Sequence, residues 1–144
     1  MRLSIRTNLA VRALMFCAVN RGRTVRKQEI ASACHASENH LAQVVNQLAR
    51  DGFLQTTRGR TGGMTLASAP DRINLGSVIR AMESRFPFAE CMEPEGGNCP
   101  LTESCRLKSV LIEALDAFYT SLDRVNLQDL VQGNSGLQAL LRLN

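Results

Sequence analysis

The stretch "SENHLAQVVNQLARDG", residues 37–52, decides the fold of this chain. Its apolar side chains recur at positions i, i+3, i+4 and i+7, which share one face of a helix. They are Leu41, Val44, Val45 and Leu48. Ser37 stands where a side chain can cap the first turn, and Gly52 stands where the helix should stop. The pattern predicts an amphipathic helix with one buried face.

The opposite face of this helix carries hydrogen-bonding side chains with little charge. They are Asn39, His40, Gln43, Asn46 and Gln47. Side chains of this kind can read base edges in the major groove of DNA, whereas a face that only meets solvent is usually rich in Lys and Glu. We therefore predict a DNA-reading helix. The expected contacts are Ser37, Asn39, His40, Gln43 and Gln47.

Two further helices are expected upstream. Residues 7–20 are apolar on nearly every face, as in a buried first helix, and Cys17 lies among them as a small core residue. A second helix, capped by Thr24 and running to about Ala33, should turn Cys34 inward. Two short helices joined by a tight turn, the second with a polar reading face, predict a helix-turn-helix.

A basic β-hairpin is expected after the reading helix. Residues 53–57 and 63–67 have the length and composition of short strands, and the turn between them contains "RGRTGG". The expected contacts at the tip are Arg58, Gly59 and Arg60. Such a hairpin is typical of a wing that touches phosphates or enters the minor groove. A nucleotide-binding loop is the alternative, but its spacing and its following helix are missing.

Charge is unevenly distributed along the chain. Residues 1–80 hold 12 Lys/Arg against 4 Asp/Glu, a net charge of +8, whereas residues 81–144 hold 5 against 9, a net charge of −4. Hydrophobic residues make up 44% and aromatic residues 4% of the 144, so Leu, Val, Ile and Ala must form the core. This composition favours helices, and the asymmetry indicates a nucleic-acid-binding head on a different kind of body.

A long helix is expected from near Thr102 to about Arg124. It keeps one apolar stripe, formed by Leu107, Val110, Leu111, Ala114, Leu115, Phe118 and Leu122. A helix of this kind outside a complete winged domain has little of its own chain to pack on. The pattern therefore predicts pairing with a second copy.

The stretch "CMEPEGGNCPLTESC", residues 91–105, carries three of the five cysteines. The spacing of Cys91, Cys99 and Cys105 lacks the paired cysteines of a structural zinc site, and the two histidines lie in the expected DNA-binding head. Three thiolates on a glycine-containing loop favour an iron–sulfur cluster. A zinc site and a disulfide switch remain as alternatives.

The predicted fold class is therefore mainly α with a small β-hairpin wing: a winged helix-turn-helix plus a long dimerisation helix. We expect a winged helix-turn-helix DNA-binding domain over residues 1–80, a cluster-binding loop region over residues 81–105, and a dimerisation helix with C-terminal helices over residues 102–144. No apolar run approaches the ~20 residues of a membrane span. No signal peptide is recognisable, so the expected location is cytoplasmic, with no membrane partner.

The order of these features resembles the winged-helix iron–sulfur repressors, the group of the rhizobial iron regulator RirA, the nitric-oxide-sensing repressor NsrR and the iron–sulfur assembly regulator IscR. "TNLAVRALMF", "RGRTGGMTLA" and "AECMEPEGGNCPLTESCRLKSVL" carry the resemblance over essentially the whole chain. It implies Cys91, Cys99 and Cys105 as cluster ligands, the 37–49 helix as the DNA reader, and a homodimer on a palindromic double-stranded operator.

Single positions at which this chain differs from the NsrR and IscR subtypes indicate which subtype it resembles most. Where the nitric-oxide sensors carry an aspartate that can reach a cluster in the partner subunit, this chain has Asn8, and where the assembly regulators carry a histidine after the last cysteine, it has Lys108. The seven-residue gap between Cys91 and Cys99 resembles the RirA type. The fourth ligand stays open, with Asn8 of a partner subunit as one option.

The expected function is a cluster-dependent DNA-binding repressor that senses iron availability through cluster stability. The expected cofactor is a 4Fe-4S cluster, with 2Fe-2S as a degraded or alternative form. Nitric oxide or redox sensing is the alternative within the family. A small iron–sulfur or thiol enzyme is the alternative of another class, but no His/Asp set accompanies the cysteines and no second domain could enclose a substrate.

Overall fold

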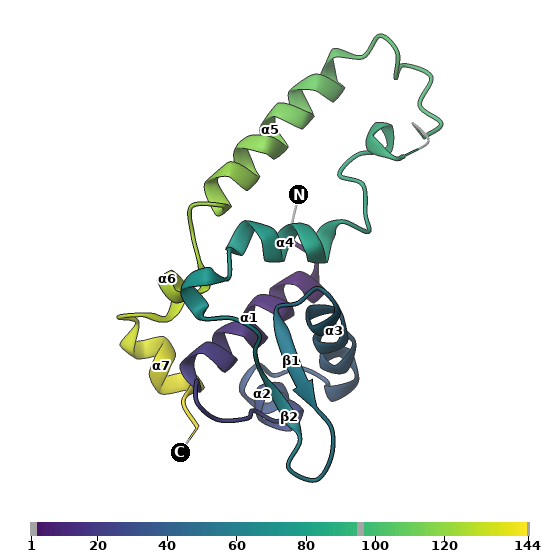
Figure 1. Ribbon diagram of the computed structural model, residues 1–144. Coiled ribbons are helices and arrows are strands. Elements are labelled where there is room, and N and C mark those ends of the chain that lie inside the picture. The colour runs from purple at the N-terminus through teal and green to yellow at the C-terminus, as the bar shows by residue number, and fades with distance from the viewer. Residues whose placement is uncertain (1–2, 95–96, 144) are drawn as a thin grey trace.

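The computed structural model describes residues 3–94 and 97–143 and is mainly helical with a single hairpin in that part of the chain (Figure 1). The elements are α1 (Ile5–Val19), α2 (Lys27–Ala33), α3 (Glu38–Arg50), β1 (Leu54–Thr57), β2 (Gly63–Leu66), α4 (Leu75–Glu83), α5 (Arg106–Leu122), α6 (Leu127–Val131) and α7 (Ser135–Leu141). Short 3-10 turns lie at Pro70–Arg72 and Glu90–Met92. The predicted fold class is confirmed.

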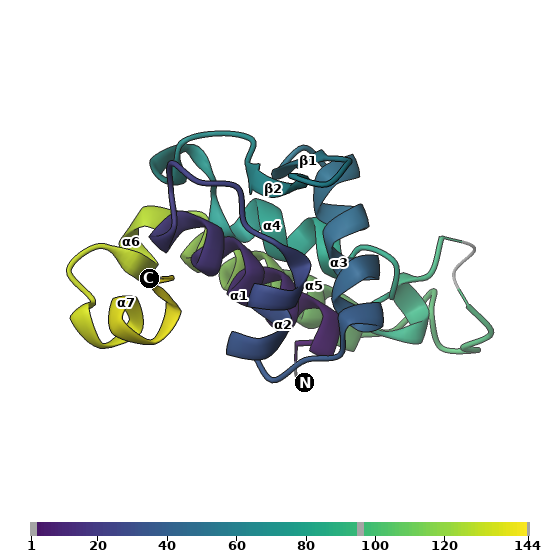
Figure 2. The same ribbon diagram turned by 90° about the horizontal axis from the view of Figure 1, so that it is seen from below.

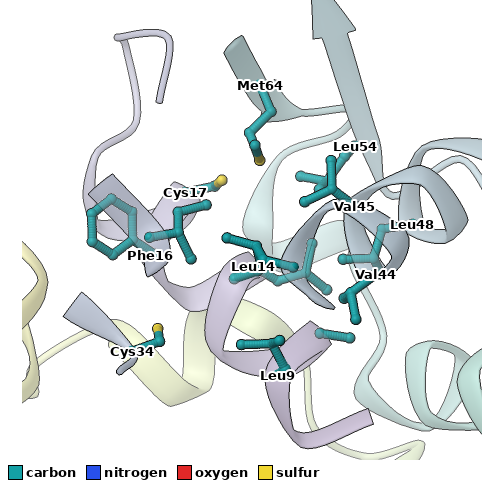
Figure 3. Packing of buried hydrophobic residues seen from close by; sticks show 14 of the residues in the cluster. Leu9, Leu14, Phe16, Cys17, Cys34, Val44, Val45, Leu48, Leu54 and Met64 are labelled. Carbon is teal, nitrogen blue, oxygen red and sulfur yellow. The ribbon is translucent and has the colours of Figure 1, made fainter. Parts of the chain in front are cut away.

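Helix α1 is the centre of the head, as its apolar sequence predicts. Its buried side chains include Leu9, Leu14 and Phe16, and α1 packs against α3, whose stripe residues Val44 and Leu48 are fully buried in the same cluster (Figure 3). Burying one such side chain contributes about 1.5–3 kcal/mol. The stripe of α3 therefore fixes which of its faces remains outside.

Helix α2 begins two residues later than expected. Thr24 does not cap it, because Val25 is extended and exchanges two backbone hydrogen bonds with Met64 of β2, at 2.9 and 2.8 Å. Helix α2 starts at Lys27 instead, and the Glu29 carboxylate accepts a hydrogen bond from the Arg26 backbone N–H at 2.7 Å. The Val25–Met64 bridge connects the wing to the helix-turn-helix.

The wing is a two-stranded antiparallel hairpin with Leu54 opposite Leu66 and Thr57 opposite Gly63. Gly59 has φ +108°, a region that side chains with a Cβ avoid. Gly63 lies against the Val25 carbonyl so closely that a Cβ would collide with it. Gly59 thus permits the bend of the turn, and Gly63 permits the close approach of β2 to Val25.

Helix α5 leaves the head as a separate rod, and the chain then returns to pack α6 and α7 on α1 (Figures 1 and 2). Leu127 and Leu141 belong to the same core as α1, and the Asn20 side-chain amide donates to the Leu141 carbonyl at 2.8 Å. Helices α6 and α7 therefore pack on α1 and complete the core of the head.

The start of α5 also differs from the expected Thr102. The Thr102 hydroxyl and backbone N–H both turn back onto the Cys99 carbonyl, at 2.8 and 3.3 Å. Residues 102–104 therefore form a turn, and Cys105 is the N-cap residue of α5. No helix among the described residues has the length and apolarity to cross a membrane.

The last turn of α4 is tied to the first turn of α1. The Ser4 backbone N–H donates to Glu83 Oε1 at 2.8 Å, and the Thr7 hydroxyl donates to the same oxygen. Burial of Glu83 acts to raise its pKa, but these hydrogen bonds outweigh burial, so the pKa of the carboxyl lies below its ordinary value. The ionised form of Glu83 therefore stabilises the fold.

The Glu83 contact predicts a defined pH dependence of stability. Because the folded pKa is lowered, its contribution is complete above the ordinary value of 4.5 and is lost as pH falls through the folded value. Glu83→Gln should lower the free energy of unfolding by about 1 kcal/mol at pH 7 and by less near pH 3. Urea unfolding at both pH values measures this. Glu113→Gln, on the exposed surface of α5, is the matched control; an equal loss at both pH values would contradict the assignment.

Candidate DNA-binding surface and cysteine loop

The outer face of α3 presents a row of exposed polar side chains. Asn39, Gln43, Asn46 and Arg50 lie on it, opposite the buried stripe. The Ser37 hydroxyl accepts a hydrogen bond from the His40 backbone N–H at 3.2 Å, so Ser37 is the N-cap that the sequence predicts. Arg50 was missed by the sequence reasoning because it follows the last predicted polar position, although its spacing from Gln43 continues the same face.

Gln47 does not belong to this row. It is only 3% exposed, its Nε2 donates to the Ala81 carbonyl of α4 at 3.1 Å, and its Oε1 accepts from Arg6 of α1 at 3.0 Å. A side chain buried between three helices has no free group for a base edge. The predicted DNA contact of Gln47 is therefore withdrawn, and its polar character serves the packing of α3 instead.

The turn between α2 and α3 forms a polar hollow of about 360 Å³. His35 in this turn has φ +50°, in the left-handed region. Its neighbours in the hollow include His40, Asn8 and Arg12, the last two from α1. Asn8 is exposed, so it lies beside the reading helix and free of the core of its own subunit.

The wing tip lies beside the start of α2. Arg58, Gly59 and Arg60 are all exposed, as a DNA-contacting wing requires. A notch of about 340 Å³ opens between the wing and α2, and Arg60 shares its lining with Arg26 and Lys27. Three cationic side chains around one notch would suit a phosphate of the DNA backbone. Arg26 and Lys27 were missed because their distance from the wing depends on the Val25–Met64 bridge.

The three loop cysteines lie at the far end of the molecule from the wing, on the connection between α4 and α5 (Figure 1). Cys91 sits in a 3-10 turn, Cys99 follows the glycines, and Cys105 caps α5. All three are half-buried. The loop is closed by Glu90, whose carboxylate accepts from the Asn98 backbone N–H at 3.3 Å.

Gly97 has φ +60° and lies against the Glu90 backbone, so a glycine is required there for the loop to curl. The sequence offers Gly96 for the same role, but this residue lies outside the described residues. Among the residues that the structure describes, no three Cys, His, Asp or Glu side chains are gathered as metal ligands. Thiolates are suitable ligands for iron, and a cluster bound by all three would require the loop to hold its thiols closer together than it does here.

The other two cysteines have a different environment. Cys17 and Cys34 are buried in the head (Figure 3), as the sequence predicts. Burial raises the pKa of Cys17 to about 12. Burial also raises the pKa of Cys34, against the opposing charge of Arg12. Because a metal ligand must be a thiolate, these two side chains are core residues, and only the loop thiols are available.

The sequence over residues 3–133 matches the model of the Rrf2 family, described as iron-dependent transcriptional regulators. The chain belongs to the Rrf2 family. It is 41% identical to protein aau3 of Rhizobium meliloti, over 99% of this chain and 93% of that protein. It is 38% identical to the HTH-type transcriptional regulator NsrR of Geobacillus kaustophilus, over 99% of this chain and 97% of that protein.

Solved structures agree with this assignment. IscR of T. potens superposes with a TM-score of 0.75 at 25% identity, over 96% of this chain and 91% of that chain. CymR, the global cysteine regulator of B. subtilis, superposes with a TM-score of 0.71 at 26% identity, over 91% of this chain and 96% of that chain. This Rrf2 protein is thus a winged-helix DNA-binding transcriptional regulator, and its relatives are regulators and not enzymes.

The notch between wing and α2 yields a prediction about salt dependence. Arg26→Ala and Arg60→Ala should each weaken binding to operator and to random DNA alike, and each should reduce the slope of log K against log salt by about 1. Fluorescence anisotropy at several salt concentrations measures both quantities. Arg142→Ala, an exposed arginine after α7, is the matched control and should leave the slope unchanged. Loss of affinity for the operator alone would assign these side chains to base reading.

Proposed function

We propose that this Rrf2 protein is a repressor whose operator binding requires an iron–sulfur cluster held by Cys91, Cys99 and Cys105. The observation that carries the proposal is the contrast between these half-buried thiols on one loop and the two core thiols. The cofactor that suits three thiolates is a 4Fe-4S cluster, with 2Fe-2S as a degraded or alternative form. When bound, it would supply a link that holds the two sides of the loop together.

The proposal includes a homodimer formed through α5. No residue of α5 is buried, and its apolar stripe leaves Leu107 60% and Val110 58% exposed. Exposed apolar side chains in a row mark an interaction surface, and a helix with a self-complementary stripe suits a two-fold contact. Two copies would place two α3 helices on a palindromic operator, with half-sites about 34–36 Å apart.

The C-terminal end of α5, which is the end away from the cysteine loop, is anchored to α4. Arg80 of α4 forms a bidentate pair with Asp123 at the end of α5, with both N–O distances 2.6 Å, and stacks over Tyr119 at 4.4 Å. With this end of α5 held, a change in the loop at its other end would change the direction of α5 relative to the head. The spacing of the two heads, and with it operator affinity, would follow the state of the loop.

Iron is the signal that we propose. Neither Asn8 nor Lys108 offers a strong fourth ligand, so one iron of a cubane would be held weakly and would equilibrate with free iron. Asn8 of a partner subunit is the proposed weak ligand. The second candidate is nitric-oxide sensing, which the 38% identity to an NsrR protein favours. Chelator and nitric oxide, titrated separately under anaerobic conditions and followed by operator binding, distinguish the two signals.

The ligand assignment predicts the outcome of replacing single cysteines. Cys91→Ser, Cys99→Ser and Cys105→Ser should each abolish the brown absorbance of anaerobically purified protein and weaken operator binding at least tenfold, since a lost ligand releases the cluster. Cys34→Ala, in the head, is the control and should keep both. A colourless wild-type protein with stoichiometric zinc would refute the iron–sulfur proposal.

The dimer assignment predicts the effect of a charge on α5. Val110→Asp should convert the dimer to a monomer of 15.8 kDa, because it places a carboxylate in an apolar contact. Ser109→Asp adds the same charge on the opposite face of α5 and should remain dimeric. Sedimentation velocity reads the mass of each variant. Dimers from both variants would place the interface elsewhere.

A further inference from the structure

Helix α3 carries a buried side-chain amide at the edge of its apolar stripe. Gln47 lies inside the head with Leu48 and Val44, and an amide buried without partners costs about 1–3 kcal/mol. Gln47 is fully satisfied, because Nε2 faces the Ala81 carbonyl and Oε1 faces Arg6. A carbonyl only accepts and a guanidinium only donates, so one orientation of this amide fits.

Arg6 connects this buried amide to the DNA-facing surface. Its guanidinium donates to Gln47 Oε1 at 3.0 Å through one nitrogen and to Gln43 Oε1 at 3.2 Å through the other. Gln43 and Gln47 are one turn apart on α3, which brings both oxygens within reach of one planar fork. Gln43 is exposed, Arg6 is half-buried and Gln47 is buried.

The bond from Arg6 decides how Gln43 can read a base. A free glutamine amide can rotate and exchange its donor with its acceptor, so it can satisfy more than one base edge. Arg6 holds the oxygen on the α1 side and leaves the NH₂ group with the outward direction, while the oxygen keeps one lone pair. A fixed donor–acceptor pair is what a bidentate contact with one base requires.

We infer that Arg6 and Gln47 are positioning residues that hold the Gln43 amide in one orientation and thereby set the base preference of α3. This inference rests on the proposed use of α3 as the reading helix. Gln47 is itself seated on Ala81, in the same turn of α4 as Glu83, which binds Ser4 and the hydroxyl of Thr7. Arg6, the hydrogen-bond partner of Gln43, is thus held by Gln47, which is itself hydrogen-bonded to α4.

The test compares base preference, not affinity alone. Wild type, Gln43→Ala, Arg6→Met and Arg6→Lys are measured, as cluster-loaded dimers, against an operator panel with every single-base change in one half-site. Gln43→Ala should lose about tenfold discrimination at one position, and Arg6→Met should lose most of it at the same position. Arg6→Lys keeps the charge but not the planar fork, so it should behave like Arg6→Met.

Matched variants separate positioning from other roles. Arg12→Met removes an arginine of α1 that has no hydrogen bond to α3, and it should retain discrimination. In the double variant Arg6→Met, Gln43→Ala, the loss at that position should equal that of Gln43→Ala alone, because Arg6 acts through Gln43. Gln47→Leu should show the same loss of base discrimination as Arg6→Met, while its thermal unfolding midpoint, followed by the α-helical signal, stays within a few degrees of wild type. If Gln47→Leu does not fold, the Arg6→Met and Arg6→Lys variants decide the question.

The outcomes distinguish failure of the positioning role of Arg6 and Gln47 from failure of the proposed base reading by α3. If Gln43→Ala leaves base preference unchanged, α3 does not read DNA through this residue, and the proposed reading fails. If Gln43→Ala changes preference but Arg6→Met does not, the positioning inference is overturned while the reading stands. Additive losses in the double variant would also overturn it, because Arg6 would then contact DNA independently.

Discussion

The structure depends on the burial of α1 on nearly all of its sides. The stripe of α3 packs against it on one side, α4 crosses it on another, and the returning helices α6 and α7 cover its end. Phe16 and Leu14 are essentially inaccessible, and the exposed side chains of α1 are confined to the face with Ile5, Asn8 and Arg12, so the neighbouring helices hold α1 on its other sides. The orientation of the polar face of α3 is therefore a consequence of core packing. The polar side chains on that face need not contribute to the stability of the fold.

The same constraint explains why the molecule has two unlike halves. The head, which comprises all the elements except α5 and the cysteine loop, holds every buried residue of the described chain, whereas α5 holds none. A segment with few buried contacts changes its arrangement at low cost, which suits the part of a regulator that carries thiols. The bidentate Arg80–Asp123 pair and the bridge between Asn74 and Asn126 connect this segment to the head at its base.

Local patterns in the sequence predict most of the fold. The spacing of Leu41, Val44 and Leu48 gives α3 and its buried face, and the glycines of "RGRTGG" give the wing. What local patterns do not give are the long-range contacts: the Val25–Met64 bridge that shortens α2, and the return of Leu141 onto the head. Both depend on partners about 40 and more than 100 positions away along the chain, which no helical or strand period contains.

The candidate site shows the same division. The exposure of Asn39 and Arg60 follows from residue type and period. Gln47 was expected on the exposed face because a glutamine beside an apolar stripe looks like a surface residue, but it is buried. Its burial is decided by two partners, Arg6 and Ala81, from helices on either side in the sequence. A polar residue at the edge of a helical stripe can thus belong to the core when a donor and an acceptor face it from opposite sides. In a DNA-binding head this matters, because such a residue shapes the reading surface from beneath without contacting DNA.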